Sequence, residues 1–282
     1  MPFLQAMVRG ARKVLPRGWA PLLQTSARVF PNLQSYRART DGDDFLYIDL
    51  RQSMCLTIFF HQGQPHEQGT EALLRYVLKP GDTFVDVGAN VGFYTRMGSV
   101  LVGESGRVFA FEPLSSALRL LKMNTESLTN VVVDARALSD HNGEADFHVR
   151  HQGDTSSLLP GEAGSRVRVG VTTLDSRLLG EGGAPTRVDF VKIDVEGAEL
   201  SVLRGATKTI EKYQPLVYFE FLPLYASQYG FGYDDFVGFF APLGYSLHWI
   251  NHDANGPELF SATESTYLAA IPSCKSGLLH QN

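Results

Sequence analysis

The segment from residue 83 to residue 94 constrains the fold of this chain more than any other. A short apolar run, Thr83 to Val87, ends in a glycine-bearing turn, Gly88-Ala-Asn-Val-Gly92, and a helical pattern follows. A strand, a glycine-rich turn and a helix in this order are how an open parallel sheet makes room for a nucleoside-bearing cofactor. Glycines remove Cβ atoms where a ligand must approach the backbone. We therefore expect an α/β fold whose first turn holds a ligand.

Strands and helices alternate along the rest of the chain. We expect strands at residues 108–111, 131–134, 188–193 and 216–221, and helices at residues 71–78, 115–127, 198–212 and 233–241. Two last strands, at residues 245–250 and 266–271, follow each other without a long helix between them. This order predicts a doubly wound, mostly parallel sheet with both faces covered. An antiparallel pair is expected at its edge.

Smaller elements are expected outside this sheet. Residues 45–50 and 54–60 resemble paired strands, and so do residues 145–149 and 166–171, with a helical turn at residues 174–179. The first 40 residues hold seven Arg or Lys and no Asp or Glu. A basic start of this kind can dock on an anionic membrane or act as a transit peptide. We favour a solvated, partly helical extension, because charge runs most often form solvated faces.

Composition excludes several classes of protein. The chain of 282 residues carries a net charge of −5, which gives no hint of a nucleic acid partner. Cys55 and Cys274 are the two cysteines, and neither stands in a zinc or disulfide pattern, so a cytoplasmic location is expected. No apolar run approaches the length needed to span a bilayer.

Two acids near the glycine turn favour one cofactor over another. Asp86 stands two residues before the turn, where a carboxylate can meet a cationic amine, and Glu112 ends the next apolar run, where it can take both hydroxyls of a ribose. A dinucleotide site would want G-x-G-x-x-G, but this chain has Asn90 where the second glycine would be. A pyrophosphate would also be repelled by an acid at the turn. S-adenosylmethionine, with its adenosine and charged amino acid end, fits better.

A second cluster of charged residues follows the strand at residues 188–193. Lys192, Asp194 and Glu196 stand at its carboxyl end, where ligands bind in open α/β sheets. The acids could bind a divalent cation through oxygen or supply a general base. Alternatively, Glu196 and Glu199 are simply acids in the first turn of a helix, where they favour the macrodipole. We assign no metal ligand.

Two weaker candidates for a base lie on later strands. Glu220 interrupts the apolar run of residues 216–221, at the carboxyl end of that strand, where it could face the same crevice as Asp194. A buried Glu paired with a lysine or a backbone donor is the equal alternative. His248, in the penultimate strand, is the reserve, although a lone histidine is more often structural.

Five separated motifs then resemble a known family. They are FVDVGANVG (residues 84–92), FEP (111–113), ALSD (137–140), TLD (173–175) and KIDVEGAE (192–199). In this order and spacing they closely resemble the FkbM family of S-adenosylmethionine-dependent methyltransferases. The resemblance covers about residues 66–272. It implies a Rossmann-like class I methyltransferase fold with a seven-stranded sheet.

The resemblance also implies roles for the residues of these motifs. The methionine end of the cofactor would be lined by Asp86, Gly88, Asn90 and Gly92. Glu112 would take the ribose hydroxyls, and the segment around Asp134, Ala137 and Leu138 would border the adenine. The methyl acceptor would lie beside Asp194, Glu196 and Gly197. Asp194 is the expected base, with Glu196 or Glu220 beside it.

The expected function is O-methylation of a hydroxyl on a sugar or natural product, as the family resemblance implies. The alternatives are an NAD-type oxidoreductase and a cofactor-binding module without catalysis. We expect an N-terminal extension at residues 1–65, the methyltransferase domain at residues 66–272 and a polar tail at residues 273–282. The expected partner is a small-molecule or glycosidic acceptor, with neither nucleic acid nor a stable membrane contact.

Overall fold

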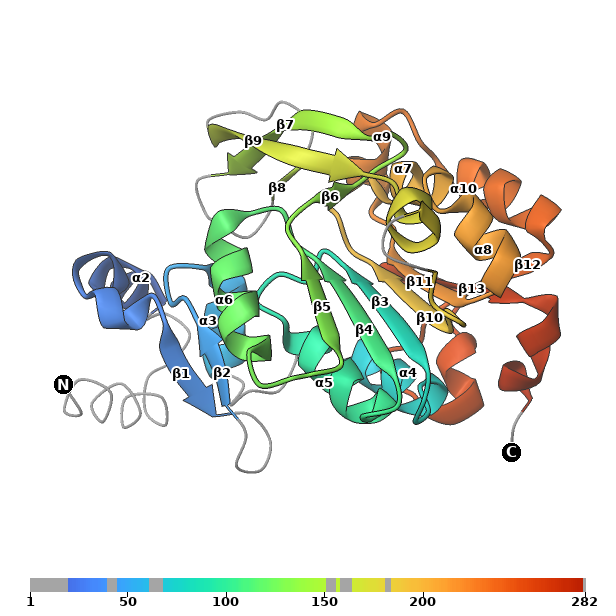
Figure 1. Ribbon diagram of the computed structural model, residues 1–282, viewed down its shortest axis with the longest axis horizontal. Coiled ribbons are helices and arrows are strands. Elements are labelled where there is room, and N and C mark those ends of the chain that lie inside the picture. Colours follow the sequence, from blue (N-terminus) through green and yellow to red (C-terminus); the bar gives the residue numbers. More distant parts are fainter. Residues whose placement is uncertain are drawn as a thin grey trace. The chain divides into compact units, whose positions relative to one another are not determined.

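The computed structural model describes residues 20–39, 45–60, 68–150, 156–157, 164–180 and 184–280. Those up to residue 60 form one compact unit, and those from residue 68 on form another. Figure 1 shows the elements of both. In the part of the chain that is described, no helix has the length and apolar character needed to cross a membrane.

A seven-stranded sheet forms the centre of the larger unit (Figure 1), in the order β12-β13-β11-β10-β3-β4-β5. Its strands are β3 (Thr83–Val87), β4 (Arg107–Phe111), β5 (Val131–Asp134), β10 (Phe190–Ile193), β11 (Leu216–Glu220), β12 (Tyr245–Trp249) and β13 (Tyr267–Pro272). β13 is antiparallel to both of its neighbours, and the other pairs are parallel. The predicted doubly wound, mostly parallel sheet with an antiparallel edge pair is confirmed.

Apolar side chains on both faces of this sheet explain why its strands read as continuous apolar runs. Along β3, Phe84 belongs to one core cluster and Val85 to the other, and each is fully buried. One face is covered by α4 (Gln68–Val77), α5 (Phe93–Val102) and α6 (Ser115–Thr125), and the other by α7 (Glu199–Arg204), α8 (Thr207–Tyr213) and α10 (Tyr233–Phe240). Burial of each large apolar side chain stabilises the fold by about 1.5–3 kcal/mol.

A smaller sheet follows β5 in the chain, in the order β6-β9-β7-β8. Its strands are β6 (Ala137–Leu138), β7 (Gly143–Arg150), β8 (Ser156–Ser157) and β9 (Gly164–Thr172). β7 and β9 pair antiparallel, with Ala145 opposite Val169, so the strand pair expected at residues 145–149 and 166–171 is confirmed. A single π-helical turn, η3 (Ser176–Gly180), occupies the place of the expected helical turn.

The helix expected at residues 198–212 is divided into α7 and α8, and the division has a local cause. A Cβ atom on Gly205 would lie 2.0 Å from the carbonyl oxygen of Ser139, so the chain passes too closely there for a side chain. Asp175 then starts α8, because its carboxylate accepts hydrogen bonds from the amides of Lys208 (3.0 Å) and Thr209 (2.7 Å). The short helix α9 (Pro223–Gln228) was not predicted.

The last residues of the chain are less separate than a polar tail suggests. Residues 273–279 form the 3-10 turns η6 (Ser273–Leu279). Leu278 and Leu279 pack against the core cluster that contains Leu73, and the Tyr76 hydroxyl donates to the carbonyl of Leu278 at 2.9 Å. Two 3-10 segments, η4 (Ala241–Leu243) and η5 (Gly256–Phe260), complete the larger unit as far as it is described.

The N-terminal unit contains α2 (Ala20–Val29), η2 (Pro31–Leu33), β1 (Tyr36–Arg39), β2 (Phe45–Ile48) and α3 (Ser53–Phe60). The strand expected at residues 54–60 is wrong, because this segment is helix α3, and β2 pairs antiparallel with β1 instead. A short apolar run that is buried on all sides fits the repeat of a helix as well as that of a strand. The first 19 residues, and with them the start of the basic segment, lie outside the described residues.

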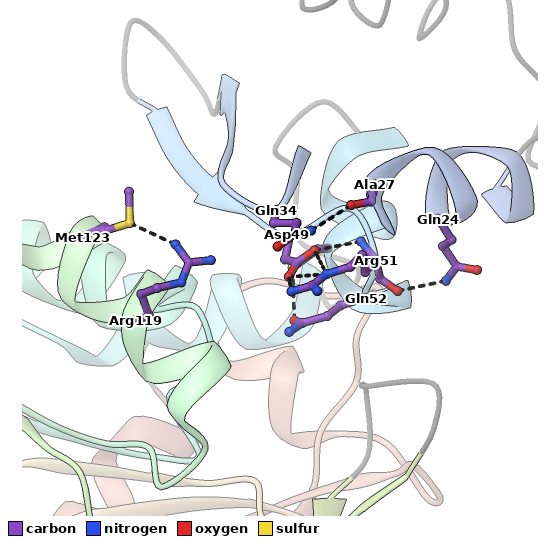
Figure 2. Close-up of polar contacts among 9 residues, drawn as sticks. Gln24, Ala27, Gln34, Asp49, Arg51, Gln52, Arg119 and Met123 are labelled. Carbon is purple, nitrogen blue, oxygen red and sulfur yellow. Dashed lines mark hydrogen bonds and ion pairs between the residues drawn. The ribbon is translucent and has the colours of Figure 1, made fainter. Parts of the chain in front are cut away.

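A charged turn separates β2 from α3 (Figure 2). The buried carboxylate of Asp49 accepts hydrogen bonds from the amide of Arg51 at 2.9 Å and from its guanidinium at 2.6 Å. The carbonyl of Arg51 accepts from Gln24, and Gln34 donates to the carbonyl of Ala27. β2 ends at Ile48, directly before the bonds between Asp49 and Arg51, and the following apolar run starts a new element.

Candidate functional site

The glycine turn after β3 is held by the protein's own atoms. Gly88 and Gly92 have φ angles of 78° and 89°, which favour glycine. A Cβ on Gly88 would lie 2.0 Å from the carbonyl oxygen of Asp194, and one on Gly92 would lie 2.6 Å from the side chain of Leu121. Both glycines are therefore required by close contacts within the protein, a reason that the sequence did not show. The approach of a ligand to the turn stays a prediction.

Asp86 is a buried acid, and only one of its two carboxylate oxygens has a hydrogen-bond partner among the described residues. Its side chain is 1% exposed, and its Oδ2 accepts a hydrogen bond from the Thr95 hydroxyl at 2.6 Å. Its Oδ1 has no hydrogen-bond partner among the described residues. Burial raises the pKa of Asp86, and the nearby Lys192 ammonium partly opposes this. A buried oxygen without a partner is costly, and a cationic amine would satisfy it.

Glu112 is fixed at the end of β4 by two backbone amides. Its Oε2 accepts from the amide of Asn90 at 2.9 Å, and its Oε1 accepts from the amide of Leu114 at 2.8 Å. Burial raises the pKa of Glu112 to about 7, against the effect of these two bonds. Each carboxylate oxygen keeps a second lone pair, so the pair can still accept from the two hydroxyls of a ribose.

The residues predicted to border the adenine follow β5. The Asp134 carboxylate binds Arg136 at 2.7 Å and Arg177 at 2.9 Å. Burial raises the pKa of Asp134, but the hydrogen bonds from the two arginines outweigh it and hold that pKa below its usual range. Ala137 and Leu138 are buried in β6, which pairs with β9. Asp134 therefore orders the chain that leads from the large sheet into the small one.

The charged cluster after β10 divides into separate parts. The Lys192 ammonium, 2% exposed, lies 3.0 Å from Oδ2 of Asp194, whose side chain is 25% exposed. Glu196 has a positive φ of 59° and lies in the turn before α7, so the alternative that places it in the first turn of a helix is wrong. Glu199 is the acid of that turn, and its Oε1 accepts from two backbone amides that precede it, at 3.0 and 3.1 Å.

Strand register shows which candidates come together. Asp86 is opposite Lys192, and Lys192 is opposite Tyr218, so their side chains leave the same face of the sheet. Asp194 and Glu220 continue this face at the carboxyl ends of β10 and β11. Glu220 is partly exposed there.

His248 is not part of this group. β11 and β13 lie between its strand, β12, and β10, so it stands three strand spacings, or about 14 Å, from Lys192. Its Nε2 pairs with the Ser246 hydroxyl at 2.9 Å, its ring lies against Phe260, and burial lowers its pKa. The structure does not bring His248 to Asp194, and its role as the reserve base stays a prediction.

Two residues of α5 belong to the site and were missed. Thr95 bonds Asp86, and the ring of Tyr94 lies 5.3 Å from the Lys192 ammonium. Their position in the first turn of the helix that follows the glycine turn was the available signal, because that turn lies against β3. Within the described residues, no three His, Cys, Asp or Glu side chains are grouped so that they could hold a metal ion.

The arrangement suits a ligand with a charged amino acid end and a ribose. Asp86 offers a buried carboxylate oxygen for an ammonium group, and Glu112 offers two fixed oxygens for a diol. Asp194 stands at the same edge of the sheet with part of its carboxylate exposed. These residues fit S-adenosylmethionine by the chemistry of the donor set.

Comparison with known proteins agrees with this fit. A family model described as the methyltransferase FkbM domain matches residues 86–247. The chain is 30% identical over 146 residues to hexuronic acid methyltransferase AglP of Haloferax volcanii, a match that covers 51% of this chain and 58% of that protein. It is 37% identical over 65 residues to a probable cobalt-precorrin-6B C(15)-methyltransferase of Saccharolobus solfataricus, covering 22% of this chain and 33% of that protein. The matches thus span less than two thirds of either relative.

Solved structures are similar in fold alone. A methyltransferase FkbM from Methylobacillus flagellatus aligns over 90% of this chain and 60% of its own length, at 17% identity and a TM-score of 0.40. A SAM-dependent O-methyltransferase from Thermotoga maritima aligns over 84% of this chain and 78% of its own, at 15% identity and a TM-score of 0.42. The family match, which covers more than half of the chain, decides between the methyltransferase and oxidoreductase alternatives. The chain belongs to the FkbM family of S-adenosylmethionine-dependent methyltransferases.

Proposed function

We propose that the protein transfers the methyl group of S-adenosylmethionine to a hydroxyl oxygen of a sugar or a related natural product. The observation that carries the proposal is the gathering of Asp86, Glu112 and Asp194 at the carboxyl ends of β3, β4 and β10. Two of these acids suit the two polar ends of the cofactor, and the third remains for the acceptor.

The cofactor would be held by its ends. Asp86 Oδ1 would accept from the α-ammonium group, and Glu112 would accept from the ribose hydroxyls while it keeps its bonds to the amides of Asn90 and Leu114. The pKa of Glu112, about 7, means that ribose binding and ionisation of this acid are linked near neutral pH. Ordered backbone donors fix Glu112 before the cofactor arrives, which lowers the entropic cost of binding.

The cofactor supplies an activated methyl group, so the chain's own residues must orient the acceptor and take its proton. Transfer forms a bond between the acceptor oxygen and the methyl carbon and breaks the bond between that carbon and sulfur. An alcohol is a poor nucleophile while it is protonated, and Asp194 would accept the proton as the new bond forms. Its carboxylate suits this role, because one oxygen is held by Lys192 and the side chain is partly exposed. Glu220, on the same face of the neighbouring strand, and Glu196 would border the acceptor.

A sugar is the acceptor class we favour. Support comes from the similarity to a hexuronic acid methyltransferase, which matches about half of this chain. The acids at the site also suit a polyhydroxylated acceptor, because carboxylates accept hydrogen bonds from vicinal hydroxyls. The site as proposed needs neither nucleic acid nor a membrane as a partner, and the cytoplasmic location stays a prediction.

Calorimetry with S-adenosylhomocysteine tests the cofactor half of the proposal, and radiolabelled methyl transfer tests the acceptor half. The acceptors would be p-nitrophenyl glycosides, including the β-D-glucuronide and the β-D-galactoside, with product methyl ethers located by mass spectrometry. We expect micromolar binding and a label on a ring hydroxyl. Absence of binding at millimolar ligand rejects the cofactor site, and label found only on carbon, nitrogen or a carboxyl group rejects methylation of a hydroxyl.

Asp194→Asn separates the two halves. It should bind S-adenosylhomocysteine within about threefold of the native protein and lose about 100-fold or more in turnover, the scale of general base catalysis. Asp253→Asn is the matched control, since Asp253 is an exposed acid of a loop beyond β12. Native turnover in Asp194→Asn would remove this residue from the proton-transfer role.

A further inference from the structure

We propose that Lys192 is a positioning residue of this site: its ammonium holds Asp194 in place for the acceptor proton and balances the charge of Asp86 on the neighbouring strand. The inference rests on the proposed function, because that function gives both acids their roles. Neither the family match nor the relatives assign any role to this lysine.

Lys192 is buried where a lysine is costly. Its side chain is 2% exposed, and removal of an ammonium group from water is unfavourable unless opposite charge compensates it. Compensation comes from Oδ2 of Asp194 at 3.0 Å and from the ring of Tyr94, whose centroid lies 5.3 Å from Nζ. A residue that only filled the core between β3 and β11 would be apolar, as Phe190 is on the same face.

The lysine also lies beside the cofactor acid. Lys192 and Asp86 are opposite each other in the parallel pair of β10 and β3, with their side chains on one face. The carboxylates of Asp86 and Asp194 and the ammonium of Lys192 make a group with one net negative charge. S-adenosylmethionine carries two positive charges and one negative charge, so it brings the one net positive charge that this group lacks. The lysine thus sets the charge that the cofactor meets.

Asp194 is held so that one of its carboxylate oxygens can still accept the acceptor's proton. Its backbone amide donates to the carbonyl of Val87 at 3.0 Å, and Lys192 binds its Oδ2. Its Oδ1 accepts no hydrogen bond from any described residue. One oxygen is therefore fixed while the other can accept a proton, and the contact with Lys192 decides which way the carboxylate points.

The first test is a double-mutant cycle on methyl transfer, with p-nitrophenyl β-D-glucuronide as the acceptor, or whichever glycoside of the panel the native protein methylates. Lys192→Met should lower kcat about tenfold or more in the native background. In the Asp194→Asn background the same change should cost less than about threefold, because the residue through which Lys192 acts is gone. An equal loss in both backgrounds overturns the proposal. If Lys192→Met alone does not fold, the comparison of Asp194→Asn with the double variant still decides, and a further tenfold loss there overturns it.

The second test needs no acceptor. Asp86 must be ionised to bind the α-ammonium group, so the affinity for S-adenosylhomocysteine is full above the pKa of Asp86 and falls below it. The Lys192 charge lowers that pKa and the Asp194 charge raises it. Lys192→Met should therefore move the fall in affinity to higher pH by roughly one unit, and Asp194→Asn should move it to lower pH. A purely structural lysine would not produce shifts of opposite sign.

Other titratable groups near Asp86 are common to all the variants. The Asp86 charge raises the pKa of Glu112, and Tyr94 and Tyr218 lie on the elements that flank Lys192. Lys275→Met is the matched control for loss of a part-buried lysine, since Lys275 donates to the carbonyl of Asp189 before the start of β10. It should keep the native pH dependence. Shifts of the same sign in both site variants, or no shift in Lys192→Met, overturn the proposal, whereas a native protein that binds no S-adenosylhomocysteine overturns the proposed function itself.

Discussion

Replacement of Thr95 by valine tests the buried acid of the site through one hydrogen bond. The Thr95 hydroxyl donates to Oδ2 of Asp86 at 2.6 Å, and both side chains are fully or almost fully buried. Oδ1 of the same carboxylate has no hydrogen-bond partner among the described residues. Valine has nearly the shape of threonine but cannot donate, so the variant removes the one bond that a described side chain gives to this carboxylate.

The expected cost depends on pH. A hydrogen bond to a charged group contributes about 1.5–3 kcal/mol to stability, and one between neutral groups about 0.5–1.5 kcal/mol. Loss of the bond should raise the pKa of Asp86 further, because the bond favours the ionised form. Burial already raises that pKa above its ordinary value, so the stability linked to Asp86 is present at low pH and is lost as pH rises through the folded-state pKa. The variant deepens this loss.

Urea unfolding of the protein without cofactor, at intervals from pH 5 to pH 8, measures the effect. The difference in free energy of unfolding between the native protein and Thr95→Val should grow as pH rises through the folded-state pKa of Asp86, by about 1–2 kcal/mol in total. Thr70→Val is the matched control, because Thr70 is equally buried and its hydroxyl pairs with that of Tyr218 at 2.5 Å. A hydroxyl–phenol pair has no group that titrates between pH 5 and pH 8, so its cost should not vary.

Equal losses in the two variants at every pH would refute the reasoning. They would mean that Thr95 bonds a carboxyl group that stays neutral throughout, and then Asp86 could not serve as the partner of an ammonium group. A pH-dependent loss in Thr70→Val alone would place the titrating group elsewhere on this face of the sheet.

Three further changes separate packing from ligand recognition. Burial raises the pKa of Glu199 to about 7, so the stability linked to this acid is present below its ordinary pKa and is lost as pH rises through 7. The side-chain carbonyl of Glu199→Gln can keep both amide bonds that Oε1 accepts. In urea unfolding at pH 8, this variant should therefore raise the free energy of unfolding by up to about 3 kcal/mol. Glu112→Gln should also reduce the fall in stability with rising pH, but with a smaller gain in the free energy of unfolding, because each oxygen of Glu112 accepts from a different amide. Of these two glutamine variants, only Glu112→Gln should weaken S-adenosylhomocysteine binding in calorimetry, by about 1.5–3 kcal/mol. Gly88→Ala should destabilise the protein by well over the cost of Gly230→Ala, which is about 1–2 kcal/mol, because the two glycines share a φ near 78° but only the first would place a Cβ against the carbonyl of Asp194. Similar melting temperatures for the two alanine variants would contradict that contact.

The sequence predicted the central sheet because its strands are apolar without interruption and alternate with helices. The helix at residues 53–60 was missed for a related reason. Cys55, Leu56, Ile58 and Phe59 are all buried, and an apolar run of this length fits a strand or a helix equally well. The turn at Asp49 and Arg51 separates this run from β2 and favours the helix, and hydrophobic periodicity gives no sign of such side-chain contacts.

The candidate site was predictable where it depends on strand ends. Acids at the carboxyl ends of β3, β4 and β10 had to meet at one edge, because neighbouring parallel strands end together. His248 lies away from these acids for the same geometric reason. β13 follows β12 in the chain but is inserted between it and β11, so a histidine close to the other candidates in sequence order is distant across the sheet.

Side-chain direction was the part that no pattern supplied. Thr95 reaches Asp86 only because α5 starts directly after the turn and lies against β3, which points its first turn at the acid. Lys192 reaches Asp194 because residues two apart on a strand share a face. The alternation of side chains along a strand is known from sequence alone, so the ion pair of Lys192 with Asp194 could have been predicted. The bond from Thr95 to Asp86 depends on the angle at which α5 leaves the turn.

The glycine turn affects ligand recognition indirectly. Gly88 and Gly92 allow a backbone path that passes against Asp194 and Leu121, and on this path Asn90 takes a left-handed conformation. That conformation aims the Asn90 amide at Glu112, and the bond holds the carboxylate that would accept the ribose. A glycine that never touches the cofactor would then still control its binding, because the turn it permits orients an acid on the neighbouring strand.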